Sequence, residues 1–134
     1  MAAVEYNFEI EQGSSFKLTL IYKDADDNVI DLTDWCARLT WTTQSGKVQT
    51  FSSTSVDHSI YKFEIVPSQG KLNLMIPAET TNMFTFDFAK YDLELQSDTD
   101  LYAGGGKNTI RILYGVISLL KRNSGSYDHL DCTT

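Results

Sequence analysis

Cysteines, long apolar runs and a leader-like N-terminus are all lacking or scarce in this sequence. Its two cysteines, Cys36 and Cys132, are too few for a disulfide framework or a zinc site. No apolar run approaches the ~20 residues that a membrane-spanning helix requires. Residues 1–13 lack the basic and apolar regions of a secretory signal. The sequence therefore predicts a soluble chain that is made in a cytosol.

Positive charge is also scarce, since 11 basic residues face 18 acidic ones and the net charge is −7. A nucleic-acid groove needs clustered lysine and arginine to displace counterions, and an anionic membrane surface attracts the same residues. We therefore expect neither nucleic acid nor a membrane as a partner. An apolar fraction of 42% argues against disorder, and 134 residues suffice for one domain with its own core.

Apolar residues alternate with polar ones in many short segments, which is the pattern of a half-buried antiparallel sheet. In "YDLEL" (91–95), for example, three apolar residues alternate with two acidic ones. Residues 109–120 form a longer, nearly continuous apolar run that suits a strand covered on both faces. About seven or eight strands are expected, which predicts an all-β sandwich or a closed barrel. The residues expected in its core include Leu39, Phe63, Leu74, Leu93 and Leu95.

The segments between these strands indicate turns. Residues 24–28 and 44–46 contain Asp, Asn, Ser and Gly, which favour hairpin loops. Residues 67–70 begin with Pro and end with Gly, as a tight turn does. Helix is expected only over residues 77–84, as a single turn that Pro77 opens.

A glycine-rich string, "AGGGK" (103–107), resembles a phosphate-binding loop. Such a loop requires Ser or Thr after the lysine and a helix that begins there. Here Asn108 follows Lys107, and the next residues have the β-branched character of a strand. The string therefore favours a mobile loop between two strands.

An acidic string, "DADDNVID" (24–31), resembles the start of a calcium loop. Asp24, Asp26 and Asn28 fall at the first ligand positions, but Val29 and Trp35 occupy the positions that require Gly and Glu. A solvated acidic hairpin is the preferred interpretation.

Nucleophilic catalysis has no clear candidate either. His58 lies in a polar loop and His129 in the C-terminal segment, where no third group fixes either ring beside a nucleophile.

The aromatic string "MFTFDF" (83–88) leaves two alternatives open. Its phenylalanines either form a platform for a carbohydrate or a partner, or line one face of a strand and fill the core. We prefer the second alternative and expect no catalysis and no cofactor.

Five strings carry a resemblance to a known family: "FEIEQGSSF", "VIDLTDWCARLTW", "GKLNLMIPAETT", "YDLELQS" and "IRILYGVISL", in this order. Together they resemble small immunoglobulin-like β-sandwich virion proteins of tailed bacteriophages, related to the N-terminal domain of phage baseplate upper proteins. The resemblance implies an immunoglobulin-like antiparallel sandwich with a structural, non-enzymatic role in the tail or baseplate. It also implies assembly in the host cytoplasm with other virion proteins, in multiple symmetric copies. A head or collar decoration protein is the alternative within the same class.

Two segments extend beyond the family pattern. In that family the "YDLEL" strand joins the next strand by a short turn, whereas residues 97–108 make a long connection here. The sandwich is expected over residues 1–120, and the polar residues 121–134 are expected to form a tail. Exposed apolar residues on such segments often become ordered against a partner. The residues that we expect to contact partners are Leu101, Tyr102, Tyr127 and Leu130.

Overall fold

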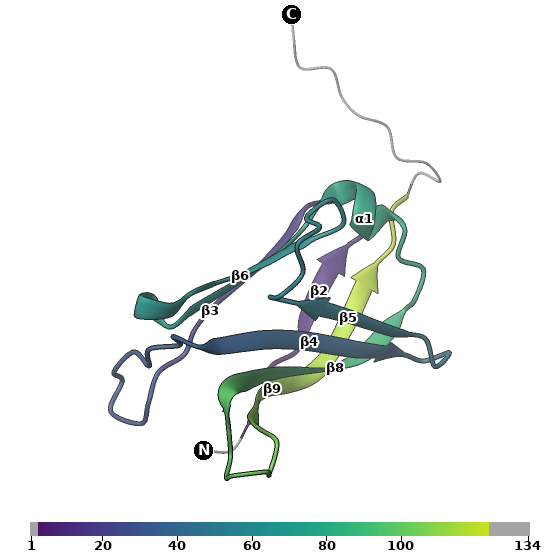
Figure 1. Cartoon of the computed structure of the whole chain (residues 1–134). Coiled ribbons are helices and arrows are strands. Elements are labelled where there is room, and N and C mark those ends of the chain that lie inside the picture. The colour runs from purple at the N-terminus through teal and green to yellow at the C-terminus, as the bar shows by residue number, and fades with distance from the viewer. Residues whose placement is uncertain (1–2, 124–134) are drawn as a thin grey trace, which may run out of the picture.

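Two β-sheets packed face to face form the protein (Figure 1). The computed structural model describes residues 3–123. The described chain contains nine strands, one α-helix and one 3-10 helix over Pro67–Gln69. The strands and the α-helix are β1 (Val4–Glu5), β2 (Phe8–Glu11), β3 (Phe16–Ile21), β4 (Trp35–Thr43), β5 (Val48–Ser52), β6 (Lys62–Val66), β7 (Lys71–Ile76), α1 (Ala78–Asn82), β8 (Phe88–Asp100) and β9 (Lys107–Leu120).

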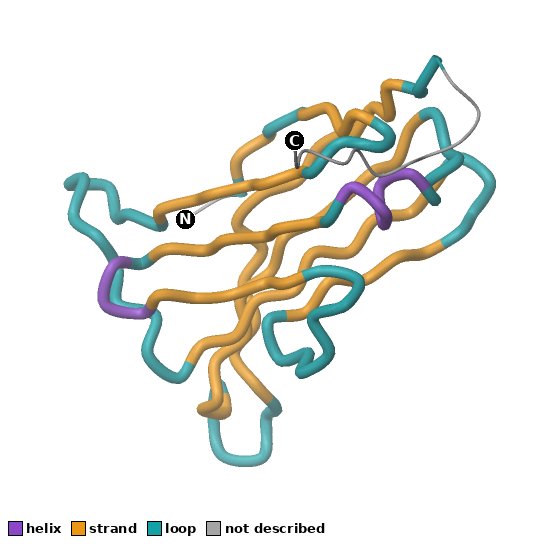
Figure 2. Tube along the Cα trace, turned by 90° about the horizontal axis from the view of Figure 1, so that it is seen from above, coloured by secondary structure: helices purple, strands orange, loops and turns teal. Residues whose placement is uncertain are grey.

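The larger sheet has the strand order β1-β9-β8-β4-β5. β2 follows β1 along the same edge and also pairs with β9, nearer its C-terminal end. The smaller sheet has the order β3-β7-β6. Figure 2 shows the strands of both sheets from above. The predicted all-β sandwich is thus confirmed. The strands number nine rather than the expected seven or eight. Their pairing also differs from the prediction, because β1 and β2 run parallel to β9 while every other strand pair described is antiparallel. Within residues 3–123, no helix is long and apolar enough to cross a membrane.

The core lies between the two sheets and is built by the alternating segments. All five residues expected in the core are buried, with exposed fractions between 0% for Leu39 and 5% for Phe63. The long run in β9 differs from the prediction, because its outward side chains stay partly exposed rather than covered. A β-bulge opposite Leu93 and Glu94 shifts the register there. Ile112 and Leu113 are consequently both buried, although they are consecutive.

The connection between α1 and β8 corrects one prediction. Residues 83–87 form no strand. Phe84 and Phe86 are half-buried against the core, whereas Phe88 begins β8 and points outward with 57% of its surface exposed. The three phenylalanines therefore do not share one face. The alternation of apolar residues in "MFTFDF" arises from a connection that crosses the edge of the core. The predicted helical turn after Pro77 is confirmed by α1.

Between β1 and β2, Tyr6 and Asn7 form hydrogen bonds that hold the N-terminal strands against β9. The backbone N–H of Tyr6 donates to Tyr114, and Asn7 Oδ1 accepts the backbone N–H of Val116 at 2.9 Å. Tyr91, which is buried in β8, donates its hydroxyl to the carbonyl oxygen of Tyr6. Beside these contacts lies Gly115, where a Cβ atom would come within 2.7 Å of Asn7 Oδ1 and closer still to the Tyr6 carbonyl oxygen. The absence of a side chain at Gly115 is what allows this close approach.

Replacing Tyr91 by Phe is expected to lower the free energy of unfolding by about 1–2 kcal/mol, because the Tyr6 carbonyl loses a buried donor. Burial, and then the neighbouring Tyr6, raise the pKa of Tyr91 to about 12 from its ordinary value of 10.0. A raised pKa means that the folded state favours the neutral phenol. The stability contributed by this group is therefore complete below pH 10 and is lost as the pH rises toward 12.

Urea titrations at neutral pH measure the loss of stability, and absorbance at alkaline pH follows the ionisation of the tyrosines. One tyrosine should titrate about two pH units above the ordinary value. That transition should be missing in Tyr91→Phe. A variant that keeps both the late transition and the full stability would contradict the role assigned to this hydroxyl.

Candidate functional site

The β8–β9 hairpin projects beyond the rest of the sandwich (Figure 1). Its strands are longer than the sequence predicts, because β8 continues to Asp100 and β9 already begins at Lys107. The predicted long connection over residues 97–108 is therefore wrong in its bounds, and the turn itself, which we call the tip, is residues 101–106. Leu101 and Tyr102 stand at the tip with 63% and 67% of their surfaces exposed.

Hydrogen bonds and glycines give the tip its shape. The N–H of Leu101 donates to the Gly106 carbonyl, and the N–H of Gly105 donates to the Tyr102 carbonyl, both at 2.8 Å. Gly104 and Gly106 both have a φ of 80°, a conformation that glycine adopts at little cost. A Cβ atom at Gly105 would lie 2.5–2.7 Å from the ring of Tyr102. The ring thus lies directly against the glycine backbone and keeps its other face in solvent.

Lys107 turns toward acidic residues on the neighbouring strand. Its Nζ donates to the backbone carbonyl of Asp98 at 2.6 Å. It also lies 3.9 Å from the Asp98 carboxylate and 3.8 Å from that of Asp100. A strand, not a helix, follows this lysine, as the sequence predicts. The glycine–lysine string therefore builds a hairpin tip whose lysine is already engaged by two carboxylates.

A cavity of about 190 Å³ opens between the β4–β5 hairpin and residues 83–87. Its deeper wall is aromatic, because the ring of Trp41 lies 5.2 Å from that of Phe84 and 5.4 Å from that of Phe86. We call it the Trp41 cavity. Its rim is polar and comes from both sides of the opening. The rim residues include Thr43, Ser45, Lys47, Gln49, Thr85 and Asp87.

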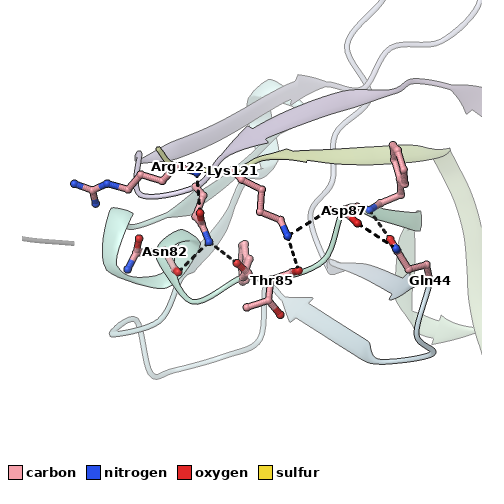
Figure 3. Close-up of polar contacts among 9 residues, drawn as sticks. Gln44, Asn82, Thr85, Asp87, Lys121 and Arg122 are labelled. Carbon is pink, nitrogen blue, oxygen red and sulfur yellow. Dashed lines mark hydrogen bonds and ion pairs between the residues drawn. The ribbon is translucent and has the colours of Figure 1, made fainter. Parts of the chain in front are cut away.

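Side chains from distant parts of the chain fix the wall of the Trp41 cavity (Figure 3). Gln44, in the β4–β5 turn, accepts the backbone N–H of Phe88 at 2.9 Å and donates to Asp87 at 3.4 Å. Lys121 donates to the Thr85 carbonyl at 3.0 Å and lies 3.3 Å from the Asp87 carboxylate. Residues 85–88 are thus held from both sides.

Gln12, just after β2, holds the other end of the same connection. Its Nε2 donates to the Phe84 carbonyl at 2.8 Å, and its Oε1 accepts the backbone N–H of Arg122 at 2.8 Å. Arg122 and Lys121 therefore remain bound to the sandwich after β9 ends at Leu120. These contacts position the partly buried aromatic rings without relying on a regular strand.

The outer face of the larger sheet is also hollowed. Two concavities of about 490 and 530 Å³ share Thr42, Lys90 and Val116 among the residues that line them. The larger is flanked by the Arg111–Asp92 pair, whose N–O distance is 3.1 Å. Exposed pairs of this kind contribute little to stability. Phe88 lines the smaller concavity and is the large exposed apolar side chain on this part of the face.

The acidic string at residues 24–31 and His58 both lie in loops. The Asp24 carboxylate accepts the backbone N–H groups of Asp26 and Asn28, each at 2.9 Å, and the string closes as a small hairpin loop, as predicted. Backbone and hydroxyl hydrogen bonds from Ser59 lower the pKa of the exposed Asp57 carboxyl beside His58. No group of three or more potential metal ligands occurs in the part of the chain that the structure describes.

The structure places two of the four predicted contact residues, Leu101 and Tyr102, together at the hairpin tip. Tyr127 and Leu130 lie outside the described residues. The Trp41 cavity was missed by sequence reasoning, because it is formed by segments that are some 40 residues apart and no local pattern pairs them. Comparison of the sequence with protein-family models gave no match, and comparison with curated proteins gave none either.

Proposed function

We propose that this chain is a structural, non-enzymatic component of a tailed-phage virion, located in the tail or baseplate. It docks to neighbouring virion proteins through its loops, its sheet edges and its C-terminal segment. The observation that carries this proposal is the projecting hairpin tip, which exposes Leu101 and Tyr102 on a turn shaped by its own hydrogen bonds. An apolar pair presented in this way suits a protein contact.

The strand order supports an immunoglobulin-like sandwich as the specific fold. If β1 and β2 count as strand A, the smaller sheet corresponds to strands B, E and D and the larger one to G, F, C and C′. Immunoglobulin sandwiches divide their strands in this way, although constant-type domains keep strand A beside strand B. All five strings of the resemblance contribute residues to the strands of this sandwich.

Open sheet edges offer further docking surfaces. In the described chain, β5 forms one edge of the larger sheet and β1 with β2 forms the other, while β3 and β6 form the edges of the smaller sheet. Edge strands present unpaired backbone groups to which another chain can add a strand.

The alternative within the same class is a head or collar decoration protein of the same fold. The competing class is a carbohydrate-binding module or an enzyme that uses the aromatic cluster at residues 83–88. The geometry favours it less, because Phe84 and Phe86 pack against Trp41 and do not form an exposed row with Phe88.

Removing the tip or the C-terminal segment is expected to impair incorporation into particles while leaving the isolated domain stable. Asp100 already pairs with Lys107, so residues 101–106 can be replaced by Asn-Gly, a favourable two-residue turn. A second variant stops at Arg122 and so keeps the described contacts of Lys121 and Arg122. The melting temperature of each purified variant and its abundance in purified particles are the measurements.

Val56→Ser serves as the matched control, because Val56 is 93% exposed in a different loop and should affect neither quantity. Normal incorporation of both shortened variants would show that assembly uses the sandwich's own faces and edges. A wild-type chain that is absent from purified particles would overturn the virion assignment itself.

A further inference from the structure

We propose that the hairpin tip of one copy inserts Tyr102, supported by Leu101, into the Trp41 cavity of a second copy. This contact joins two different surfaces of the same chain, one on each copy. The inference rests on the proposed function, because it identifies the partner of the tip as a second copy of this chain. The contact itself, however, is a property of the purified chain. It can therefore fail or hold independently of the virion assignment.

The tip has the properties of an inserting group. Tyr102 is 67% exposed although it is an aromatic residue, and one face of its ring already rests on Gly105. An aromatic ring with few rotatable bonds loses little conformational freedom on binding. Aromatic residues that enter a pocket dominate the energy of many interfaces.

The Trp41 cavity has the size and chemistry to receive that ring. Its volume is about 190 Å³, and an apolar cavity of roughly 150 Å³ accommodates benzene. Phe84 and Phe86, which are half-buried, supply an aromatic wall against which another ring packs favourably, and Trp41, only 2% exposed, lies behind them. Ser45 and Gln49 stand among the lining residues and offer hydrogen-bond partners to a phenolic hydroxyl.

A tip cannot fill the cavity of its own chain. β8 begins immediately after the cavity residue Asp87 and ends immediately before Leu101. It contains 13 residues, and a strand rises about 3.3 Å per residue, so the path along β8 between the two surfaces is roughly 40 Å long. The hairpin correspondingly extends away from the end of the sandwich where α1 lies (Figure 1). Because tip and cavity are different surfaces, each copy can bind two others, which produces a ring or a filament.

The charges around the two surfaces are complementary. Beside the tip, Asp98 and Asp100 share a single lysine, Lys107, which leaves one negative charge in excess. At the cavity rim, Asp87 is paired with Lys121, whereas Lys47 is exposed and has no ion pair among the described residues. The rim therefore carries one positive charge in excess. Opposite charges at the edge of an interface favour encounter and fix its orientation.

Sedimentation of the full chain as a function of concentration tests the inference. The wild-type protein is expected to form species larger than a dimer. The tip variant Leu101→Ser/Tyr102→Ser and the cavity variant Thr85→Trp should each raise the dissociation constant by about tenfold or more. Thr85 is exposed at the rim, and its contact with Lys121 uses the backbone carbonyl, so the substitution leaves that hydrogen bond in place.

Mixing the two variants gives the decisive result. The tip variant keeps an intact cavity and the cavity variant keeps an intact tip, so an equimolar mixture should form a 1:1 dimer and nothing larger. Ala103→Cys, which keeps Tyr102 at the exposed tip, and Thr85→Cys, each in a background with Cys36 and Cys132 replaced by Ser, should form a disulfide-linked dimer when mixed under oxidation. A wild-type chain that stays monomeric at millimolar concentration overturns the inference. So does association that neither variant weakens, or a mixture that forms no dimer.

Discussion

Replacing Gly115 by Ala is expected to lower the free energy of unfolding by about 3–5 kcal/mol, among the largest effects of a single substitution. The added Cβ atom would overlap the backbone of Tyr6 and approach Asn7 Oδ1 to 2.7 Å. Because the obstacle is backbone rather than the end of a flexible side chain, β1 and β2 would have to move off β9. That movement would break the strand pairing and expose Ile10, which is fully buried. Urea denaturation measures the loss.

Gly46→Ala provides a matched control of the opposite kind. Gly46 has a φ of 90° but nothing within 4 Å of a Cβ atom, so its substitution strains the backbone without a collision. The expected cost is about 1–2 kcal/mol. Hydrogen exchange should show that Gly115→Ala lowers the protection of the amides in β1 and β2, whereas Gly46→Ala leaves it unchanged. Equal losses of stability in the two variants would mean that the N-terminal strands do not depend on the bare backbone at Gly115.

Replacing Leu93 by Ala should cost roughly 2–5 kcal/mol, the range observed when a packed leucine site is emptied. Leu93 is 1% exposed and stands in β8, the strand that lies between β4 and β9. It pairs with Leu39 on one side and Leu113 on the other, and both of these are buried too. The cavity would therefore open at the centre of the larger sheet, where neighbouring side chains cannot easily close it.

Lys90→Ala on the same strand is the control for Leu93→Ala. Lys90 is exposed on the opposite face and forms no ion pair in the described chain, so its replacement should change stability by no more than about 0.5 kcal/mol. Chemical denaturation of both variants under the same conditions makes the comparison. A loss below half a kcal/mol for Leu93→Ala would mean that the inward face of β8 has been misassigned.

Local patterns predicted the strands well because each alternating segment has one face in the core. Leu39, Leu74 and Leu95 were placed correctly from the period of two alone. The same reasoning failed for residues 83–87, because an irregular connection can also bury every second residue when it crosses the edge of a core. Phe84 and Phe86 show this, since they pack on Trp41 without belonging to a strand.

Contacts between distant segments were beyond local reasoning. Nothing near Gln12 in the sequence indicates that it binds the carbonyl of Phe84, 72 residues away. The parallel pairing of β1 and β2 with β9 depends equally on a distant partner, namely the bare backbone of Gly115. The sequence predicted a loop at the hairpin tip, but placed its bounds wrongly. The polar residues before the tip lack an apolar alternation, yet they still belong to β8. Exposed strand residues carry no burial signal, so their sequence resembles a loop.

The parallel arrangement of the first and last strands has a mechanical consequence. The chain enters the larger sheet at Val4 and leaves it at Leu120, which lies at the opposite end of the paired strands because β1, β2 and β9 run in the same direction. A pulling force applied between these two points would slide the strands along one another. The inter-strand hydrogen bonds would then share the load in shear, instead of opening one after another as in a zipper. Tension transmitted through the two ends of the sandwich would thus meet its greatest resistance at the β1/β2–β9 seam.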